Sequence, residues 1–518
     1  MVLNARFFML ILCAFLVLGG YRIGHTASKH SLDPIKPVRT NLTSGYVVRT
    51  ATEGELRQLE LTPPLLPDLS PYTAEAVYAK LETTQRGRAV IRHMRDVFSL
   101  NEFTKKPGRL AEWATRQGTT PVAIVIEGGY VTPGDLIGML PSEYIEQTAP
   151  GIFILRLPLV VGPDAALHID ASIEEFRLSE ERGAFLVNDG FLFITDTALT
   201  GWRERENLPA RFRLQTEFRP FVLSFGGSEI YIVNSLIASM GYAATKSYGV
   251  SISQYGPKDL RTRPVPRPTG WLINSTVQDN WYGLYTYEAD DLVVLGNLFL
   301  ENISYGIDPH DRSRRLIIAN NIAEGTKKRH GIIISREVND SWIFGNRSHH
   351  NRLSGIMIDR KSVNNVIANN QTHNNGSDGI AILESSNNLV WGNHIFSNAK
   401  DGIRVRNSAD IRIFENLISM NKIGIHGYGK DLSSISRDTN RDPYEQQLSV
   451  DLVGGQLRDN PSAIKLDQPL RARLYRIDFS GNSRIRLAGT LNQYQDQLLD
   501  ILVRQHAAAI IEQITSIP

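Results

Sequence analysis

The feature that most constrains the fold of this chain is a glycine that recurs at an almost constant interval through its second half. Each of these glycines is followed by Leu or Ile, and successive glycines are separated by 23, 25, 24, 24, 23 and 22 residues. A fixed period of this length is typical of a solenoid, in which one short supersecondary unit stacks on the next. We therefore expect a repeat fold, marked by Gly283, Gly306, Gly331, Gly355, Gly379, Gly402 and Gly424.

A series of asparagines runs in step with the glycines and indicates which kind of solenoid forms. Asparagine tolerates the left-handed backbone of tight turns, and stacked side-chain amides can hydrogen bond to one another along the stacking axis. Ile, Val and Leu alternate between the two series, as in strands with one buried face. The pattern predicts an all-β fold, a right-handed parallel β-helix over residues 121–430 whose clearest repeats span 270–430. The asparagines are Asn274, Asn297, Asn321, Asn346, Asn370, Asn393 and Asn416.

The first residues, 1–27, have the composition of a secretory signal peptide. Arg6 supplies positive charge, residues 7–20 are apolar, and small residues follow. The apolar stretch is short for a bilayer span, which needs about 20 residues, so we expect no integral membrane span in the mature chain. His25 is unusual so close to the expected cleavage site, which leaves an uncleaved anchor as the alternative. The only cysteine, Cys13, lies in this segment, so the mature chain forms no disulfide.

The segments on either side of the repeats lack the periodicity. Residues 28–120 form a partly helical N-terminal leader, in which we predict helices over 70–81 and 86–116 and a docking or capping role. Residues 431–518 form a C-terminal capping region, because the open end of a β-helix exposes unpaired backbone and apolar core. We predict a terminal helix there with one apolar face, formed by Tyr494, Leu498, Ile501 and Leu502.

The glycine register also predicts which side chains face outward. With a period of two, the first and third residues after each glycine point into the core, and the second and fourth point out. At one repeat the outward residues are Asp308 and His310, with Asp311 next in the chain. Most other repeats carry no carboxylate or imidazole here, so this break in the pattern predicts the active site.

Tyrosines precede this site along the outward column, and cationic residues follow it on neighbouring repeats about 4.8 Å apart. The formal net charge, +2 at pH 7, identifies no partner, but this local stripe suits a long anionic polysaccharide rather than a nucleic acid. Sugar rings can stack on tyrosine, and carboxylates pair with arginine. The alternative is that the charges serve only solubility. The candidate substrate-binding residues are Tyr285, Tyr287, Asp359, Arg360, Lys361, Arg404 and Arg406.

Several other histidines lie nearer to turns than to this column. Imidazole is a common polar residue at turns, and we assign these side chains no role in catalysis. They are His330, His349, His350, His373 and His394.

The segment Tyr305-Gly306-Ile307-Asp308-Pro309-His310-Asp311, placed on such a coil, resembles the mannuronan C5-epimerases. The order of signal, leader, coil and cap resembles the periplasmic members that act in bacterial alginate biosynthesis. The resemblance implies an enzyme that converts β-D-mannuronate to α-L-guluronate within the polymer, in the periplasm, beside an alginate export and modification complex. It also implies that His310 is the catalytic base and Arg336 neutralises the substrate carboxylate. Calcium-requiring secreted members have Glu where this chain has Asp311, and they carry nonapeptide repeats absent here, so we expect no metal and no cofactor.

The chemistry of the residues agrees with this resemblance. Removing the C5 proton builds negative charge on the adjacent carboxylate, which a cation such as Arg336 can offset. An imidazole such as that of His310 can accept the proton near neutral pH. We expect one of Asp308 and Asp311 to orient the imidazole and the other to position sugar hydroxyls or water. The group that returns a proton from the opposite face stays open between Tyr287 and a water molecule.

Two alternatives share the fold. A polyuronate lyase performs the same first step and then expels the C4 oxygen, for which Tyr285 and Tyr287 are candidate acids. A non-catalytic periplasmic scaffold would only guide the polymer towards export. The ultraviolet absorbance of an unsaturated uronate end distinguishes a lyase from an epimerase.

Overall fold

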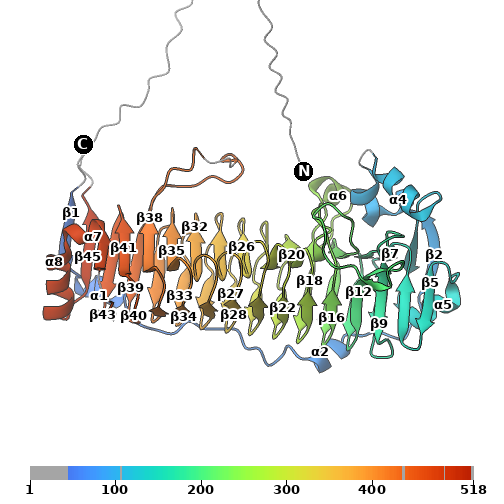
Figure 1. The fold of residues 1–518 in the computed structure, drawn as a ribbon, viewed down its shortest axis with the longest axis horizontal. Coiled ribbons are helices and arrows are strands. Elements are labelled where there is room, and N and C mark those ends of the chain that lie inside the picture. The colour runs from blue at the N-terminus through green and yellow to red at the C-terminus, as the bar shows by residue number, and fades with distance from the viewer. Residues whose placement is uncertain (1–44, 106–107, 435–437, 483–484, 515–518) are drawn as a thin grey trace, which may run out of the picture. The chain divides into compact units, whose positions relative to one another are not determined.

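The computed structural model describes residues 45–514, apart from 106–107, 435–437 and 483–484. The predicted signal peptide lies outside the described residues. No helix among them is long and apolar enough to cross a membrane. Three 15-stranded sheets make up the fold, and each coil of the chain adds one strand to each sheet (Figure 1). The predicted parallel β-helix is therefore confirmed.

The strands pair in parallel within each sheet except at the ends of the stack and at one side hairpin. Sheet A contains β1 (Tyr46–Thr50), β4 (Gly129–Val131), β8 (Ala165–Ile169), β11 (Phe191–Thr195), β15 (Glu229–Val233), β18 (Thr269–Ile273), β21 (Val293–Leu295), β24 (Ile317–Ala319), β27 (Trp342–Phe344), β30 (Val366–Ala368), β33 (Leu389–Trp391), β36 (Ile411–Phe414), β39 (Ser449–Val453), β42 (Arg471–Tyr475) and β45 (Ala509–Gln513). Sheet B contains β2 (Arg88–His93), β3 (Val122–Glu127), β7 (Leu159–Val161), β10 (Leu186–Asn188), β14 (Val222–Phe225), β17 (Gly249–Ser253), β20 (Tyr282–Tyr287), β23 (Tyr305–Asp308), β26 (Ile332–Ser335), β29 (Ile356–Asp359), β32 (Ile380–Leu383), β35 (Asp401–Arg406), β38 (Ile423–Tyr428), β41 (Ser462–Asp467) and β44 (Ile485–Gly489). Sheet C contains β5 (Ile145–Ala149), β6 (Ile152–Leu155), β9 (Glu175–Ser179), β12 (Ala198–Arg203), β13 (Leu208–Pro209), β16 (Leu236–Ala238), β19 (Thr276–Gln278), β22 (Leu298–Leu300), β25 (Ile322–Glu324), β28 (Arg347–His349), β31 (Gln371–His373), β34 (His394–Phe396), β37 (Leu417–Ser419), β40 (Gln456–Arg458) and β43 (Asp478–Gly481).

Short helices cover the ends and the outside of this stack. They are α1 (Glu53–Arg57), α2 (Ala74–Tyr78), η1 (Met94–Asp96), η2 (Phe98–Leu100), α3 (Asn101–Thr104), α4 (Arg109–Gln117), α5 (Pro133–Met139), α6 (Pro257–Thr262), α7 (Thr490–Gln493), α8 (Gln495–Leu499) and the π-helical turn η3 (Asp500–Arg504).

The recurring glycines lie in sheet B where successive coils approach most closely. A Cβ atom on Gly283 would lie 2.4 Å from the carbonyl oxygen of Gly306, and one on Gly306 would lie 2.5 Å from that of Gly331. A side chain cannot occupy that space without moving the neighbouring coil. The first and third residues after the glycines, such as Ile332 and Ile334, are fully buried in one continuous core, as the register predicts.

The predicted asparagine ladder forms at a corner of the coils. The Nδ2 atom of Asn297 donates to the Oδ1 atom of Asn321 at 3.0 Å, and the same bond repeats rung by rung to Asn416. Asn274 does not belong to it, because Ser275 takes that place and its backbone N–H donates to Asn297. A second ladder, which the sequence analysis did not identify, contains Asn351, Asn375, Asn398, Asn421, Asn460 and Asn482.

The N-terminal leader contains less helix than predicted, and of residues 70–81 only Ala74–Tyr78 (α2) is helical. Residues 88–93 form strand β2, antiparallel to β3, so the predicted helix over 86–116 is wrong there. The physical reason is that β3 offers an unpaired edge, and the β-branched Val90 and Ile91 fit a sheet better than a helix. Helix appears only later, and α4 buries Trp113 against Phe185.

The stack of coils also continues past residue 430, which corrects the predicted end of the β-helix. Strand β38 pairs in parallel with β41, but Asn421 and Asn460 on these successive coils are 39 residues apart. The interval lengthens because a loop is inserted between residues 429 and 448, and its described residues, 429–434 and 438–448, lie outside the three sheets (Figure 1). The repeat is therefore interrupted by an insertion and not lost. The end of the stack is covered by α7, α8 and η3, where Leu498 is buried in the core.

The segment between β1 and β2 runs along the outside of sheet A (Figure 1). Leu59 packs against Phe414 and Val453 near the C-terminal end of the stack. Farther along, Leu66 and Leu69 pack against sheet A in its middle, and Val77 of α2 packs against Phe193 near the N-terminal end. We call residues 51–81 the strap.

Candidate active site

The outward face of sheet B brings His310 and Asp311 together at the end of β23. The His310 Nδ1 atom lies 2.6 Å from the Asp311 Oδ2 atom, and the backbone N–H of His310 donates to the Thr286 hydroxyl at 3.3 Å. Asp311 adopts a left-handed backbone conformation, φ 41°, which turns its carboxylate back towards the ring. With Nδ1–H donating to Asp311, the Nε2 atom of His310 presents its lone pair. The His310 side chain keeps 17% of its surface exposed.

The Asp311 carboxylate is held in its ionised form. Burial raises the pKa of its carboxyl, but the hydrogen bond with His310 and the charge of Arg336 outweigh that effect, so the pKa lies below its usual value. An ionised carboxylate on Nδ1 fixes the tautomer of an imidazole and stabilises the imidazolium that forms when it accepts a proton. Of the two predicted carboxylates, Asp311 is the one that contacts the imidazole.

Asp308 lies on the same strand in a different environment. Asp308 is only 2% exposed, and its Oδ1 atom has no hydrogen-bond partner among the described residues. Burial raises the pKa of this carboxyl to about 7, against the lowering effect of His310. Near neutral pH, Asp308 therefore exists in both the protonated and the ionised forms.

A cluster of aromatic rings lies beside Asp308, and Arg329 donates a hydrogen bond to the Tyr305 hydroxyl there at 2.6 Å. Tyr282 stacks on Tyr248 with ring centroids 4.6 Å apart and meets Tyr305 edge-on at 5.0 Å. Tyr285, which the sequence predicted for substrate binding, lies with its ring centroid 6.0 Å from that of His310. Tyr282 and Tyr305 were not predicted as site residues. The signal for both was their position immediately before a repeating glycine.

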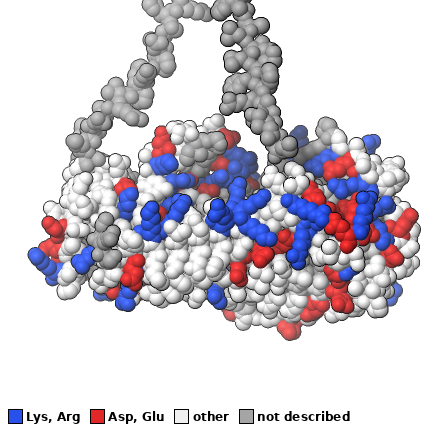
Figure 2. Space-filling view, viewed as in Figure 1, with Lys and Arg blue, Asp and Glu red and all other residues white. Residues whose placement is uncertain are grey.

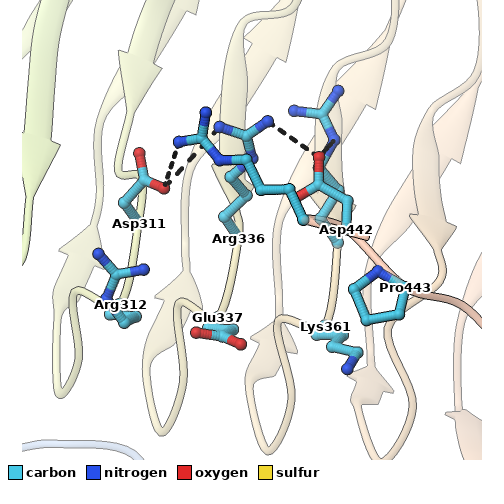
Figure 3. Close-up of a pocket in the computed structure, with 9 residues that line it drawn as sticks. Asp311, Arg312, Arg336, Glu337, Lys361, Asp442 and Pro443 are labelled. Atoms are coloured by element: carbon cyan, nitrogen blue, oxygen red, sulfur yellow. Dashed lines mark hydrogen bonds and ion pairs between the residues drawn. The ribbon is translucent and has the colours of Figure 1, made fainter. Parts of the chain in front are cut away.

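Arg336 occupies the corner of the next coil, directly after β26 with φ 63°. Its Nη1 atom lies 3.9 Å from the Asp311 Oδ1 atom, and its Nη2 atom donates to the Asp442 Oδ2 atom at 2.9 Å. Arg360, one coil farther, places its Nε atom 3.7 Å from the same oxygen of Asp442. Two guanidinium groups from successive coils thus converge on a single carboxylate (Figure 3).

Asp442 belongs to the loop of residues 429–448 and was not predicted. The loop also brings Arg441, whose Nη2 atom lies 3.8 Å from Asp311, and Pro443 to the same cavity as Arg336 and Lys361. No sequence signal could have placed these residues, because the loop follows no repeat register. Figure 2 shows Lys and Arg side chains in a broken band along the face of the molecule that is in view.

Several predicted substrate-binding residues form ion pairs or hydrogen bonds with neighbouring side chains. Arg404 pairs with the buried Asp378 at 2.7 Å, and Arg406 forms a bidentate pair with Glu384 at 2.7 and 3.1 Å. The Tyr287 hydroxyl accepts a hydrogen bond from Arg312 at 3.3 Å. Asp359 lies beside Arg360, with the Arg360 Nε atom 3.4 Å from its Oδ2 atom, and Lys361 lines the cavity.

The described residues hold one group of three or more His, Asp, Glu or Cys side chains close enough to share a metal ion. It lies on sheet C, at Glu324, His349 and His350, and not at His310.

Comparison with known proteins places this site in context. Residues 326–440 match the protein family described as right handed beta helix region, and residues 269–375 match the family of the periplasmic copper-binding protein NosD. The chain is 52% identical to a mannuronan C5-epimerase of Pseudomonas aeruginosa over 92% of this chain and 88% of that one. It is 50% identical to the mannuronan C5-epimerase AlgG of Azotobacter vinelandii over 90% of both. The crystal structure of the periplasmic alginate epimerase AlgG superposes with a TM-score of 0.80 at 46% identity, covering 81% of this chain and 99% of that one.

Proposed function

Because the chain belongs to the mannuronan C5-epimerase family, we propose that His310, Asp311 and Arg336 invert C5 of mannuronate residues on the outer face of sheet B. The protein is a periplasmic alginate epimerase with a right-handed parallel β-helix. The observation that carries the assignment of the site is the placement of a His–Asp pair and a carboxylate-binding arginine on adjacent coils. A base and a cation are both needed at the same uronate residue.

His310 acts as the base in this proposal. Asp311 holds the Nδ1–H, so Nε2 takes the proton from C5, and the imidazolium that forms is stabilised by the ionised Asp311. The ring is partly exposed on the outer face of sheet B, where a polymer can lie.

Arg336 offsets the charge that develops on the sugar carboxylate when C5 loses its proton. The contact with Asp442 supports this role, because it demonstrates that a carboxylate fits between Arg336 and Arg360. We propose that the substrate carboxylate takes the place of Asp442 when the polymer binds. Arg360 then holds the same carboxylate from the next coil.

Asp308 and the tyrosines form the other side of the reacting sugar in this arrangement. A carboxyl group with a pKa of about 7 can donate a hydrogen bond to a sugar hydroxyl when protonated and accept one when ionised. The partly exposed rings of Tyr282 and Tyr285 offer flat surfaces for sugar rings on one side of His310. The guanidinium groups offer positive charge on the other side.

The enzyme acts on a polymer that crosses the periplasm, and we propose that it works beside the machinery that exports and modifies this polymer. Chemical cross-linking in alginate-producing cells, followed by mass spectrometry, tests this part of the proposal. Recovery of export or modification proteins with the wild-type chain is the expected result. Recovery of the chain alone contradicts it.

The reaction itself is tested by incubating the mature protein with polymannuronate in deuterated water. Proton NMR is expected to show guluronate residues that carry deuterium at C5, and ultraviolet absorbance is expected to show no unsaturated ends. Unsaturated ends would instead identify a lyase. If folded protein yields neither product, the epimerase and lyase functions are both refuted and the scaffold function remains.

Variants test the roles of the residues in the same assay. We expect His310→Ala to lower kcat by about 10²- to 10⁴-fold and Arg336→Ala to lower it by about 10²- to 10³-fold, with polymer binding only partly weakened. Arg412→Ala, an exposed arginine on sheet A, is the matched control and should be fully active. Unchanged turnover in either site variant would refute its assigned role.

A further inference from the structure

Three potential metal ligands converge on the outside of sheet C, away from the epimerase site. Glu324 ends β25 and His349 ends β28, and the two residues are direct neighbours in the parallel register of the sheet. His350 follows in the chain. The ligand atoms of these three side chains all lie within 4.8 Å of one another.

The convergence of His349 and His350 depends on a local change in the backbone. Successive residues of a strand point to opposite faces, so two adjacent histidines would normally diverge. His350 instead has φ 55°, and this left-handed conformation turns its ring towards that of His349. Their Nδ1 atoms are 2.9 Å apart, and their ring planes are nearly perpendicular at 85°.

The corner residue of the coil beside His350 is Gly325, with φ 69°, so this corner carries no side chain. On the next coil, His373 stacks on His349 at 4.8 Å with planes 10° apart, and Phe396 stacks on His373 at 4.7 Å. This stack fixes the plane of the His349 ring, as supporting residues do around metal-binding histidines.

We propose that Glu324, His349 and His350 bind a divalent transition-metal ion of the zinc type. Two imidazole nitrogens and one carboxylate oxygen are a common ligand set for zinc, with water in the fourth position. Nitrogen ligands of a tetrahedral zinc ion lie about 3.3 Å apart, given zinc–nitrogen bonds of about 2.0–2.1 Å, and the separation of 2.9 Å is close to that value.

The ion would connect two successive coils, because Glu324 lies on one coil and both histidines lie on the next. It would therefore stabilise the stack and take no part in epimerisation, whose residues lie on sheet B. The competing interpretation is a plain hydrogen bond between His349 and His350, which requires no ion and leaves Glu324 without a role in the cluster.

The test is isothermal titration of zinc chloride into the full mature protein after treatment with a chelator. We expect saturable binding of one ion and a rise in the thermal unfolding midpoint on adding zinc. His350→Ala and Glu324→Gln should each weaken binding at least tenfold. His394→Gln is the matched control, because His394 is an exposed histidine on the same sheet outside the cluster, and it should bind zinc like the wild type.

Wild-type protein that binds no zinc in saturable fashion would overturn the proposal, and so would equal binding by His350→Ala. The epimerase assay gives a second readout, and chelator treatment should leave the rate unchanged. A rate that falls with the chelator and returns with zinc would overturn the assignment to a structural ion. If His350→Ala fails to fold, the milder Glu324→Gln, whose side chain has the same shape, gives the decisive titration.

Discussion

At the scale of single residues, Asp311 determines which nitrogen of His310 can act. Its carboxylate accepts the Nδ1 proton at 2.6 Å, so the lone pair faces outward on Nε2. The sequence places both residues side by side, but adjacency in a strand does not bring side chains together. The left-handed conformation of Asp311 does, and equivalent corner residues such as Arg336 and Arg360 share it.

We expect Asp311→Asn to lower kcat by about 10²-fold or more while KM changes little. An asparagine amide can donate to Nδ1, which leaves the proton on Nε2 and removes the base. Steady-state kinetics on polymannuronate measures the two constants separately. Asp340→Asn, at an exposed corner of another sheet, serves as the control, and a loss that appeared only in KM would contradict the role assigned to Asp311.

Asp308 should make stability depend on pH in an unusual direction. Its pKa is about 7 in the folded protein and near 3.9 in an unfolded chain, so between these values the folded state binds more protons. The free energy of unfolding therefore falls as pH rises through this window because of Asp308. The charged groups that act on Asp308 are His310, Asp311, Arg329 and Arg360.

We accordingly expect Asp308→Asn to be more stable relative to the wild type at pH 8 than at pH 5. Urea denaturation followed by circular dichroism at both pH values measures the difference. A stability difference between the two proteins that did not change with pH would show that Asp308 is ionised throughout this range.

At the scale of elements, the loop of residues 429–448 places a carboxylate where the substrate carboxylate is expected to bind. Asp442 contacts Arg336 at 2.9 Å, and this contact must break when a uronate binds there. We expect Asp442→Asn to lower KM for polymannuronate by about fivefold, which corresponds to roughly 1 kcal/mol for a partly exposed ion pair.

Initial rates across a range of polymer concentrations measure this change. Glu445→Gln, on the same loop but exposed, is the control for a loss of negative charge and should keep the wild-type KM. A higher KM in Asp442→Asn would mean that the loop carboxylate helps to bind the polymer and does not compete with it.

The glycine column of sheet B sets the distance between coils. A Cβ atom on Gly424 would lie 2.5 Å from the carbonyl oxygen of Ala463 and 2.6 Å from a methyl group of Leu457. We expect Gly424→Ala to lower the free energy of unfolding by about 1–3 kcal/mol, the usual cost of overpacking. Gly138 of α5 has open space around it, so Gly138→Ala should be neutral or slightly stabilising in the same urea titration. Equal effects at the two positions would show that the column is not under steric constraint.

The strands that belong to the repeat could be predicted from the sequence, because the repeat period and the alternation of side chains are local properties. They place His310, Asp311, Arg336 and Arg360 on successive outward corners. The loop that carries Asp442 could not be predicted, because its position depends on contacts with distant coils. The prediction of a helix over residues 88–93 is wrong for the same reason, because the pairing of β2 with β3 outweighs the local preference of the chain. The register could also have identified Tyr305, which immediately precedes Gly306, but outward positions were predicted only after each glycine.

At the scale of the whole described molecule, the strap joins coils that are far apart along the stack. It covers apolar side chains on the outside of sheet A, including Trp271, Ile317 and Phe344. Because each coil otherwise contacts only its neighbours, such repeat folds can open locally at one end. The strap makes the ends depend on one another.

We expect removal of residues 45–81, which deletes β1 together with the strap, to lower the thermal unfolding midpoint and to increase binding of the dye ANS to exposed apolar surface. The epimerase site on sheet B should keep its activity at low temperature, because the strap contacts sheet A. An unchanged midpoint would show that the strap lies on the surface without stabilising it.

The antiparallel pairing of β1 with β45 has a consequence for synthesis and export. The first strand of the folded unit can find its partner only when residues 509–513 are present, so the two ends of the chain close the structure in its last step. A polypeptide that emerges from a translocon with its N-terminus first would therefore wait with an unpaired leading strand. This delay is the kind of interval in which a periplasmic chaperone would have access to the chain. The nearness of β1 and β45 equally makes the chain a candidate for circular permutation, with the old ends joined and new ends cut in a loop.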